Sequence, residues 1–142
     1  MNDICQFIPP KDHPSDLSFF HFVYEVELKR LKQPFTNGNY YAQVVFRGNA
    51  ILKTEGKRYH LTRGDLFFTQ PYQSYMLDSD NDFSFMYISF NGNGALPLLQ
   101  EHNIRKDNCV FRNLEQILPF WIESIRRIKP SNANTLTESV LL

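Results

Sequence analysis

Cysteine is scarce in this sequence, and a surplus of positive charge is missing. The two cysteines, Cys5 and Cys109, lie far apart and form no Cys-x-x-Cys pair, which argues against a disulfide framework or a structural zinc site and fits a reducing compartment. Fifteen Lys and Arg residues are balanced by fifteen Asp and Glu residues, whereas a domain that binds phosphates needs a basic surface. We therefore expect these residues by themselves to bind nucleic acid poorly.

Long apolar stretches are also missing. No segment reaches the run of about eighteen apolar residues that a membrane-spanning helix requires, and the N-terminus has no apolar run of signal-peptide length. The sequence therefore predicts a soluble, cytoplasmic protein with no membrane partner. At 142 residues, the chain has the length of a single domain.

The residue patterns of metal binding and catalysis are absent as well. None of the four histidines belongs to a His-x-His or His-Glu-x-x-His pattern. There is no Gly-x-Ser-x-Gly motif for a nucleophile and no glycine-rich phosphate loop. We interpret Cys109 as a buried, small apolar residue and Asp65 as a turn residue whose carboxylate binds backbone amides. The sequence predicts no catalytic residue, no metal and no cofactor.

Aromatic residues, by contrast, are abundant, with thirteen Phe and seven Tyr. Many of them lie in segments where apolar and polar residues alternate, which is typical of half-buried strands. We expect about seven to nine short strands, as in a sandwich or a barrel. The clearest candidates are residues 20–28, 40–46, 50–54, 57–61, 66–69, 74–77 and 83–90.

The side-chain pattern also predicts how some of these strands are buried. In residues 20–28 and 40–46, the even-numbered side chains are taken to face the interior. Residues 50–54 and 57–61 flank Glu55-Gly56, which predicts a tight hairpin. Residues 83–90 are apolar on both faces, so this strand is expected to be covered on both sides and to lie deep in the fold.

After residue 94 the apolar period changes from two to three or four, which predicts helices. The segment from Thr135 to Glu138 has the form of a capping box at the start of a further helix. We divide the chain into an N-terminal arm with a brief edge strand (1–18), a ligand-binding barrel (19–94) and a helical dimerisation or linker segment (95–142).

Five short segments occur in order between residues 40 and 90, namely 46–53, 56–57, 63–68, 70–71 and 87–90. Together they resemble the strand-glycine hairpin, the Pro-Gly-Asp strand entry, the Pro-Pro-Gly turn and the closing aromatic-x-x-Phe strand of the sensor domain of AraC/XylS-family bacterial transcription regulators. The resemblance implies a mainly β fold, a cupin-like double-stranded β-helix or jelly-roll barrel followed by C-terminal helices. One departure is Tyr75, which stands where many cupins keep a histidine.

The resemblance also implies that a small-molecule effector binds inside the barrel. By motif position, the cavity wall would include Tyr75, Leu77, Phe85 and Tyr87. Strand alternation adds Tyr24, Ala42 and Val44, and Arg30, from a small basic cluster, is a candidate for the cavity mouth. For each aromatic residue of this set, plain core packing is the alternative interpretation.

Members of the family usually dimerise through helices that follow the barrel. Here the candidate dimerisation stripe is Leu114, Ile117, Leu118, Trp121, Ile125 and Ile128, which could also pack on the barrel's own outer face. Our hypothesis is an effector-binding and dimerisation domain that senses a sugar or related metabolite. DNA would be contacted only through a helix-turn-helix domain beyond residue 142. The alternatives are a metal-dependent cupin enzyme and a lectin-like sugar binder.

Overall fold

The computed structural model describes residues 4–8, 17–26, 31–35, 38–80, 82–128, 133 and 140. The strands are β1 (Ile4–Phe7), β2 (Ser18–Val26), β3 (Leu31–Phe35), β4 (Tyr40–Arg47), β5 (Ala50–Thr54), β6 (Lys57–Leu61), β7 (Leu66–Thr69), β8 (Tyr75–Ser79), β9 (Ser84–Asn91) and β10 (Val110–Phe111). The helices are α1 (Ala95–Glu101), the short 3₁₀ helix η1 (Glu115–Ile117) and α2 (Leu118–Arg127).

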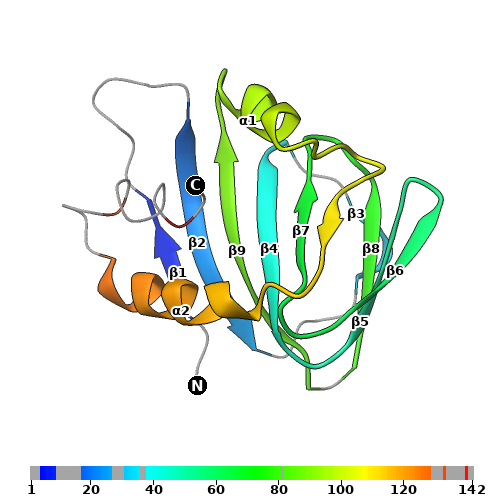
Figure 1. Cartoon of the computed structure of the whole chain (residues 1–142), viewed down its shortest axis with the longest axis horizontal. Coiled ribbons are helices and arrows are strands. Elements are labelled where there is room, and N and C mark those ends of the chain that lie inside the picture. The colour runs from blue at the N-terminus through cyan, green and yellow to red at the C-terminus, as the bar shows by residue number, and fades with distance from the viewer. Residues whose placement is uncertain are drawn as a thin grey trace.

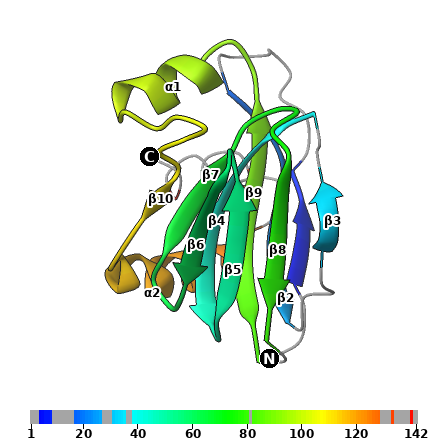
Figure 2. The ribbon, with the colours of Figure 1, turned by 90° about the vertical axis from the view of Figure 1, so that its right-hand side faces the viewer.

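The strands form two antiparallel sheets that face each other (Figures 1 and 2). The larger sheet has six strands in the order β1-β2-β9-β4-β7-β10, and the smaller has four in the order β3-β8-β5-β6. The predicted edge strand in the N-terminal arm is confirmed, because β1 pairs with β2 at the edge of the larger sheet. The predicted bounds of β5, β6 and β7 are also confirmed, whereas β3 and β10 were not expected from the sequence.

The hairpin between β5 and β6 follows from its turn residues. Glu55 and Gly56 both adopt positive φ angles, 51° and 71°, as the two central residues of a tight hairpin turn do. This backbone twist matches the right-handed twist of the flanking strands. The local sequence alone therefore fixes the register, in which Thr54 faces Lys57.

Strand β9 lies between β2 and β4 in the larger sheet, and both of its faces are covered, as its apolar pattern predicted. Phe85 points between the sheets, whereas Met86, Ile88 and Phe90 point to the opposite face. Two hydrophobic cores result. We call the one between the sheets the inter-sheet core and the one on the far side of the larger sheet the outer core.

Helix α2 covers the outer core. Pro119 occupies its first turn, where a missing N–H group costs no helical hydrogen bond. Leu118, Trp121 and Ile125 are buried against the larger sheet, and the rings of Trp121 and Phe22 meet edge to face at a centroid distance of 5.6 Å. The helix thus buries its apolar stripe within the same chain.

Two expectations about which side chains face the interior are wrong. Phe20 was expected inside, but it is 39% exposed, because the register of β2 against β9 shifts between Phe19 and His21. Gln43 was expected outside, but it is 3% exposed, because β4 is covered by the smaller sheet on one face and by the outer core on the other.

The turn between β6 and β7 is tied to the segment that leads into α2. The carboxylate of Asp65 is 3% exposed and accepts hydrogen bonds from the Thr62 backbone amide at 2.9 Å and from the Arg112 guanidinium at 2.8 Å. Arg112 also donates to the His60 carbonyl. The prediction that Asp65 binds a backbone amide in its turn is confirmed. Cys109 is buried as predicted, and burial raises the pKa of its thiol to about 11.

Candidate functional site

The polar side chains of the inter-sheet space gather where β4, β7 and β9 run side by side. Antiparallel pairing places Gln43 opposite Tyr87 and Tyr41 opposite Thr69. Tyr75 belongs to the smaller sheet and faces these residues from across the space. We call these five residues, Tyr41, Gln43, Thr69, Tyr75 and Tyr87, the inter-sheet polar cluster.

A column of aromatic rings adjoins this cluster. On β9 and the residue before it, the rings of Phe83 and Phe85 stack at 5.5 Å, and those of Phe85 and Tyr87 stack at 5.8 Å. The Tyr41 ring leans on Tyr87 at 5.4 Å. Because alternate residues of a strand point to the same face, the spacing in the sequence builds this column directly. It offers flat apolar surface beside polar groups.

Two buried donors in the cluster, Gln43 Nε2 and Thr69 Oγ1, make no hydrogen bond of normal geometry, although both interact with the Tyr75 hydroxyl. Most buried polar atoms in proteins are hydrogen-bonded, and leaving one unpaired costs roughly 1–3 kcal/mol. Such atoms therefore mark a place where a further molecule, water or ligand, completes the structure.

The tyrosine hydroxyls of the cluster stay protonated over the physiological range. Burial raises the pKa of Tyr75 to about 12, although the nearby side chains of Gln43 and Thr69 act in the opposite direction. Burial also raises the pKa of Tyr87, and the negative charge of Glu25 raises it further. Both hydroxyls are thus neutral groups that can donate as well as accept hydrogen bonds.

The structure brings together four of the residues predicted to bind a ligand and separates the others from them. Tyr75, Leu77 and Phe85 lie in the inter-sheet core, with Tyr87 packed against it. Tyr24, Ala42 and Val44 lie in the outer core on the opposite face of the larger sheet, so they share no wall with Tyr75. The expectation of one common wall was wrong, because alternation distinguishes two faces without saying which one is inside the barrel. Arg30 lies outside the described residues.

Sequence reasoning missed Tyr41, Gln43 and Thr69. The odd-numbered residues of β4 were assigned to the surface because Gln43 is polar, yet Val45, which shares their face, is apolar and fully buried. An apolar residue in the supposedly exposed set was the signal that both faces of β4 are covered. For Thr69 there was no comparable signal, since threonine is common on either face of a strand.

Comparison with known proteins agrees with this geometry. The model of the AraC-like ligand-binding domain family matches residues 36–142, which is more than half of the chain. The chain belongs to that family. The mainly β, cupin-like fold and the family resemblance that the sequence suggested are confirmed. No curated protein matches the chain significantly in sequence.

Several solved structures resemble this AraC-like domain. The protein YhaK from Escherichia coli aligns with a TM-score of 0.52 and 19% identity, covering 63% of this chain and 44% of YhaK. A cupin superfamily protein from Desulfitobacterium hafniense aligns with a TM-score of 0.44 and 8% identity, covering 62% and 76% of the two chains. Salicylate 1,2-dioxygenase from Pseudaminobacter salicylatoxidans aligns at 0.42 and 16% identity, covering 62% of this chain and 23% of the enzyme. The AraC-like domain thus spans less than a quarter of the dioxygenase.

The predicted dimerisation stripe is largely occupied within the AraC-like domain. Leu118, Trp121 and Ile125 are at most 3% exposed, and Ile117 and Ile128 pack against the same outer core while partly exposed. Leu114 is half-buried and lies before η1. The stripe therefore packs on the barrel's own outer face, and its use in a dimer stays a prediction.

Two classes of site find no support among the described residues. In that part of the AraC-like domain, no group of three or more His, Cys, Asp or Glu side chains could hold a metal ion. The same residues include no helix long and apolar enough to cross a membrane.

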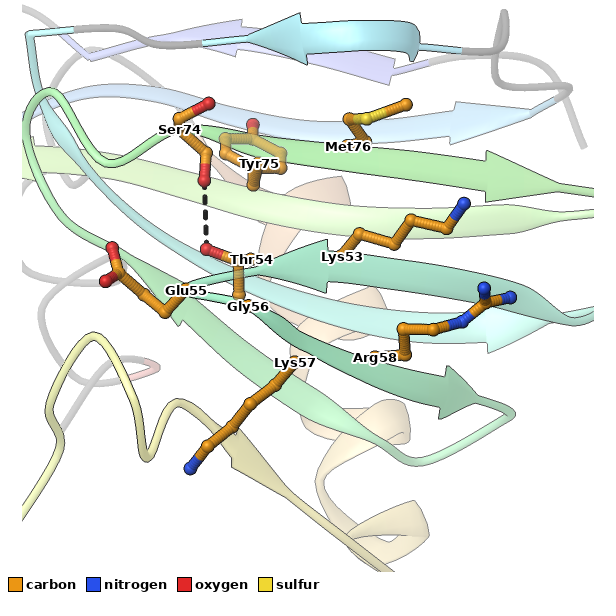
Figure 3. Close-up of a pocket in the computed structure, with 9 residues that line it drawn as sticks. All are labelled: Lys53, Thr54, Glu55, Gly56, Lys57, Arg58, Ser74, Tyr75 and Met76. Carbon is orange, nitrogen blue, oxygen red and sulfur yellow. Dashed lines mark hydrogen bonds between the residues drawn. The ribbon is translucent and has the colours of Figure 1, made fainter.

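A hollow of 490 Å³ lies at the end of the smaller sheet where β5 meets β6 and β8 begins (Figure 3). It is lined by residues 53–58 and 74–76. Among the predicted ligand-binding residues, Tyr75 reaches it. Two of its charged side chains, Lys53 and Arg58, come from the face of the sheet that points away from the inter-sheet core. We treat this hollow separately from the inter-sheet polar cluster.

Proposed function

We propose that this AraC-like domain is a sensor that binds a small uncharged molecule, such as a sugar or a related metabolite, at the inter-sheet polar cluster. The observation that carries the proposal is that two buried donors, Gln43 Nε2 and Thr69 Oγ1, make no hydrogen bond of normal geometry. They lie beside two tyrosine hydroxyls that remain neutral. A molecule with several oxygen acceptors would satisfy these groups.

The aromatic column supports the same ligand class. Tyr87, the half-buried end of the column, presents apolar ring surface, on which the apolar face of a sugar or another ring can pack. Ligand sites combine such surface with a few polar groups that fix orientation. The negative charge of Glu25 acts on Tyr87, which favours a ligand without negative charge.

We further propose that binding is converted into regulation through the N-terminal arm and α2. Strand β1 pairs with β2, and Gln6 Nε2 donates a hydrogen bond of 3.3 Å to the Ile125 carbonyl in α2. A ligand that favours one placement of this arm shifts its population by the difference in affinity for the two placements. The proposal includes a homodimer, the absence of catalysis, and DNA contact through a separate helix-turn-helix domain.

The test is a thermal-shift screen of the chain with neutral sugars and small phenols. A compound that binds only the native state raises the unfolding temperature by mass action. We expect Gln43→Leu to weaken binding of such a compound by about tenfold, because one hydrogen bond to a buried group is lost.

Ser84→Ala is the matched control, because it removes another buried, unpartnered hydroxyl that by strand alternation lies on the opposite face of β9. Binding should be unchanged in this variant. Equal binding by the native chain and the Gln43→Leu variant would show that the ligand is held elsewhere.

A further inference from the structure

The hollow on the smaller sheet has an unusual arrangement of charge. On β5 and β6, Lys53 and Arg58 are directly opposite each other, and Met76 of β8 is opposite Lys53 on the other side. The three side chains therefore form one row across three strands, on the face that points away from the inter-sheet core (Figure 3). Like charges directly opposite each other on neighbouring strands repel and destabilise the pair.

No ion pair in the described part of the chain relieves this repulsion, although Asp78 of β8 lies diagonal to Lys53 on the same face. Neither Lys53 nor Arg58 makes an ion pair or a side-chain hydrogen bond with any described residue. Glu55 is the nearest carboxylate in sequence, but Figure 3 shows its side chain directed away from the Lys53 ammonium. The two cations are thus available to an acidic group from outside the domain.

The neighbouring charged residues do not neutralise the positive charge of Lys53 and Arg58. The Lys57 ammonium donates to the Asp107 carbonyl at 2.9 Å, so it is held at the rim of the hollow. The Asp107 carboxylate is paired with Arg105 at 3.1 Å. The positive charge is therefore local, because the whole chain carries a formal net charge of zero.

The hollow is also held in shape. Thr54 Oγ1 donates to the Ser74 carbonyl at 3.0 Å and accepts a hydrogen bond from Gln73 Nε2 at 2.9 Å. These bonds tie the end of β5 to the start of β8. Met76, half-buried beside Lys53, supplies a flexible apolar surface that can adapt to a partner side chain.

We infer that this hollow is a docking site for an acidic segment of a partner protein. A carboxylate of that segment would lie between Lys53 and Arg58, and a neighbouring apolar side chain would pack on Met76. This inference is independent of the ligand proposed for the inter-sheet polar cluster. The occupant is a protein segment rather than a free metabolite, because Glu55, Lys57 and Arg58 are exposed around the hollow, whereas small-molecule sites bury most of their ligand.

Nucleic acid fits the hollow less well. Phosphate backbones are bound by extended basic surfaces that neutralise many charges at once. Here only Lys53 and Arg58 are available, and the chain has no basic surplus. Two cations beside the apolar side chain of Met76 are suited to bind one or two carboxylates that have a hydrophobic residue next to them.

The test is a titration of the isotopically labelled chain with a synthetic peptide of Glu and Leu residues, followed by backbone amide NMR signals. We expect the largest shift changes at residues 53, 58 and 76, and binding that weakens as salt is raised. The double variant Lys53→Gln/Arg58→Gln should bind about tenfold more weakly, which corresponds to about 1.4 kcal/mol.

Arg47→Gln/Arg127→Gln is the matched control, because it removes the same charge from two exposed ion pairs elsewhere. This control should bind the peptide as the native chain does. A second variant, Lys53→Glu/Arg58→Glu, keeps the test decisive if the first variant is unstable. It should bind a peptide of Lys and Leu residues at the same positions of the chain.

Three results would overturn the inference. The first is that the native chain does not bind the peptide. The second is that peptide binding weakens equally in the Gln double variant and in its control. The third is that duplex DNA displaces the peptide from residues 53 and 58 at a lower concentration than an equally charged peptide does. The last result would assign the hollow to nucleic acid.

Discussion

The packing of α2 gives the sharpest prediction, because two neighbouring aromatic residues on this helix have opposite surroundings. Trp121 is 3% exposed and its ring packs edge to face with Phe22 at a centroid distance of 5.6 Å, whereas Phe120 is 48% exposed. Substituting each with Ala therefore compares a core residue with a surface residue on one helix. If α2 packs mainly on its own sheet, only the first substitution should reduce stability strongly.

The expected magnitude follows from burial. Replacing a buried Trp by Ala costs about 3–5 kcal/mol, since the cavity left behind is only partly refilled. That is a large share of the roughly 5–15 kcal/mol that stabilises a typical domain. For a chain of this length, it corresponds to a fall in unfolding temperature of roughly 10–17 °C. Phe120→Ala should change the free energy of unfolding by no more than about 0.5 kcal/mol.

The measurement is urea unfolding followed by circular dichroism, because Trp121 is the single Trp of the chain and its fluorescence is lost in the variant. Unfolding should be recorded at two protein concentrations about a hundredfold apart, since stability gained through a dimer depends on concentration. We expect the loss in Trp121→Ala to be the same at both. Equal losses in the two variants, or a Trp121 effect that changes with concentration, would refute packing within one chain.

Two further predictions concern backbone strain and pH. Gly48→Ala should lower stability in thermal unfolding by about 2 kcal/mol more than Gly56→Ala. Both glycines have positive φ, but a Cβ added at Gly48 would lie 2.6 Å from the Asp82 carbonyl oxygen. A Cβ added at Gly56 would have no atom within 4 Å. Equal losses would contradict this steric account. Burial raises the pKa of Tyr75 from 10.0 to about 12, so the folded state holds the hydroxyl proton more tightly than the unfolded state does. The contribution of this proton to the free energy of unfolding is fully present below pH 10 and is lost as the pH rises to 12. Tyr75→Phe should lose less stability over that interval, and identical pH profiles would contradict a buried hydroxyl.

Local chemistry made several elements predictable. The hairpin of β5 and β6 depends on two turn residues that adopt positive φ, and the burial of β9 depends on its own apolar residues. The ordered segments between residues 40 and 90 identified the family. The capping box at residues 135–138 lies outside the described residues, so that helix stays a prediction.

Only the tertiary structure showed which element each strand face or helix face packs against. Alternation showed that β4 has two faces, but only the packed sheets revealed that Gln43 points between them, while Ala42 and Val44 point toward α2. Likewise, the apolar stripe of the helix was visible in the sequence. The burial of its Trp121, however, depends on contact with Phe22, 99 positions earlier in the chain. The sequence by itself determined the periodicity, the turns and the family, because these depend on neighbouring residues. Only the tertiary structure decided which face is buried against which element, because hydrophobic burial has no direction and is satisfied by whichever apolar surface the fold brings close.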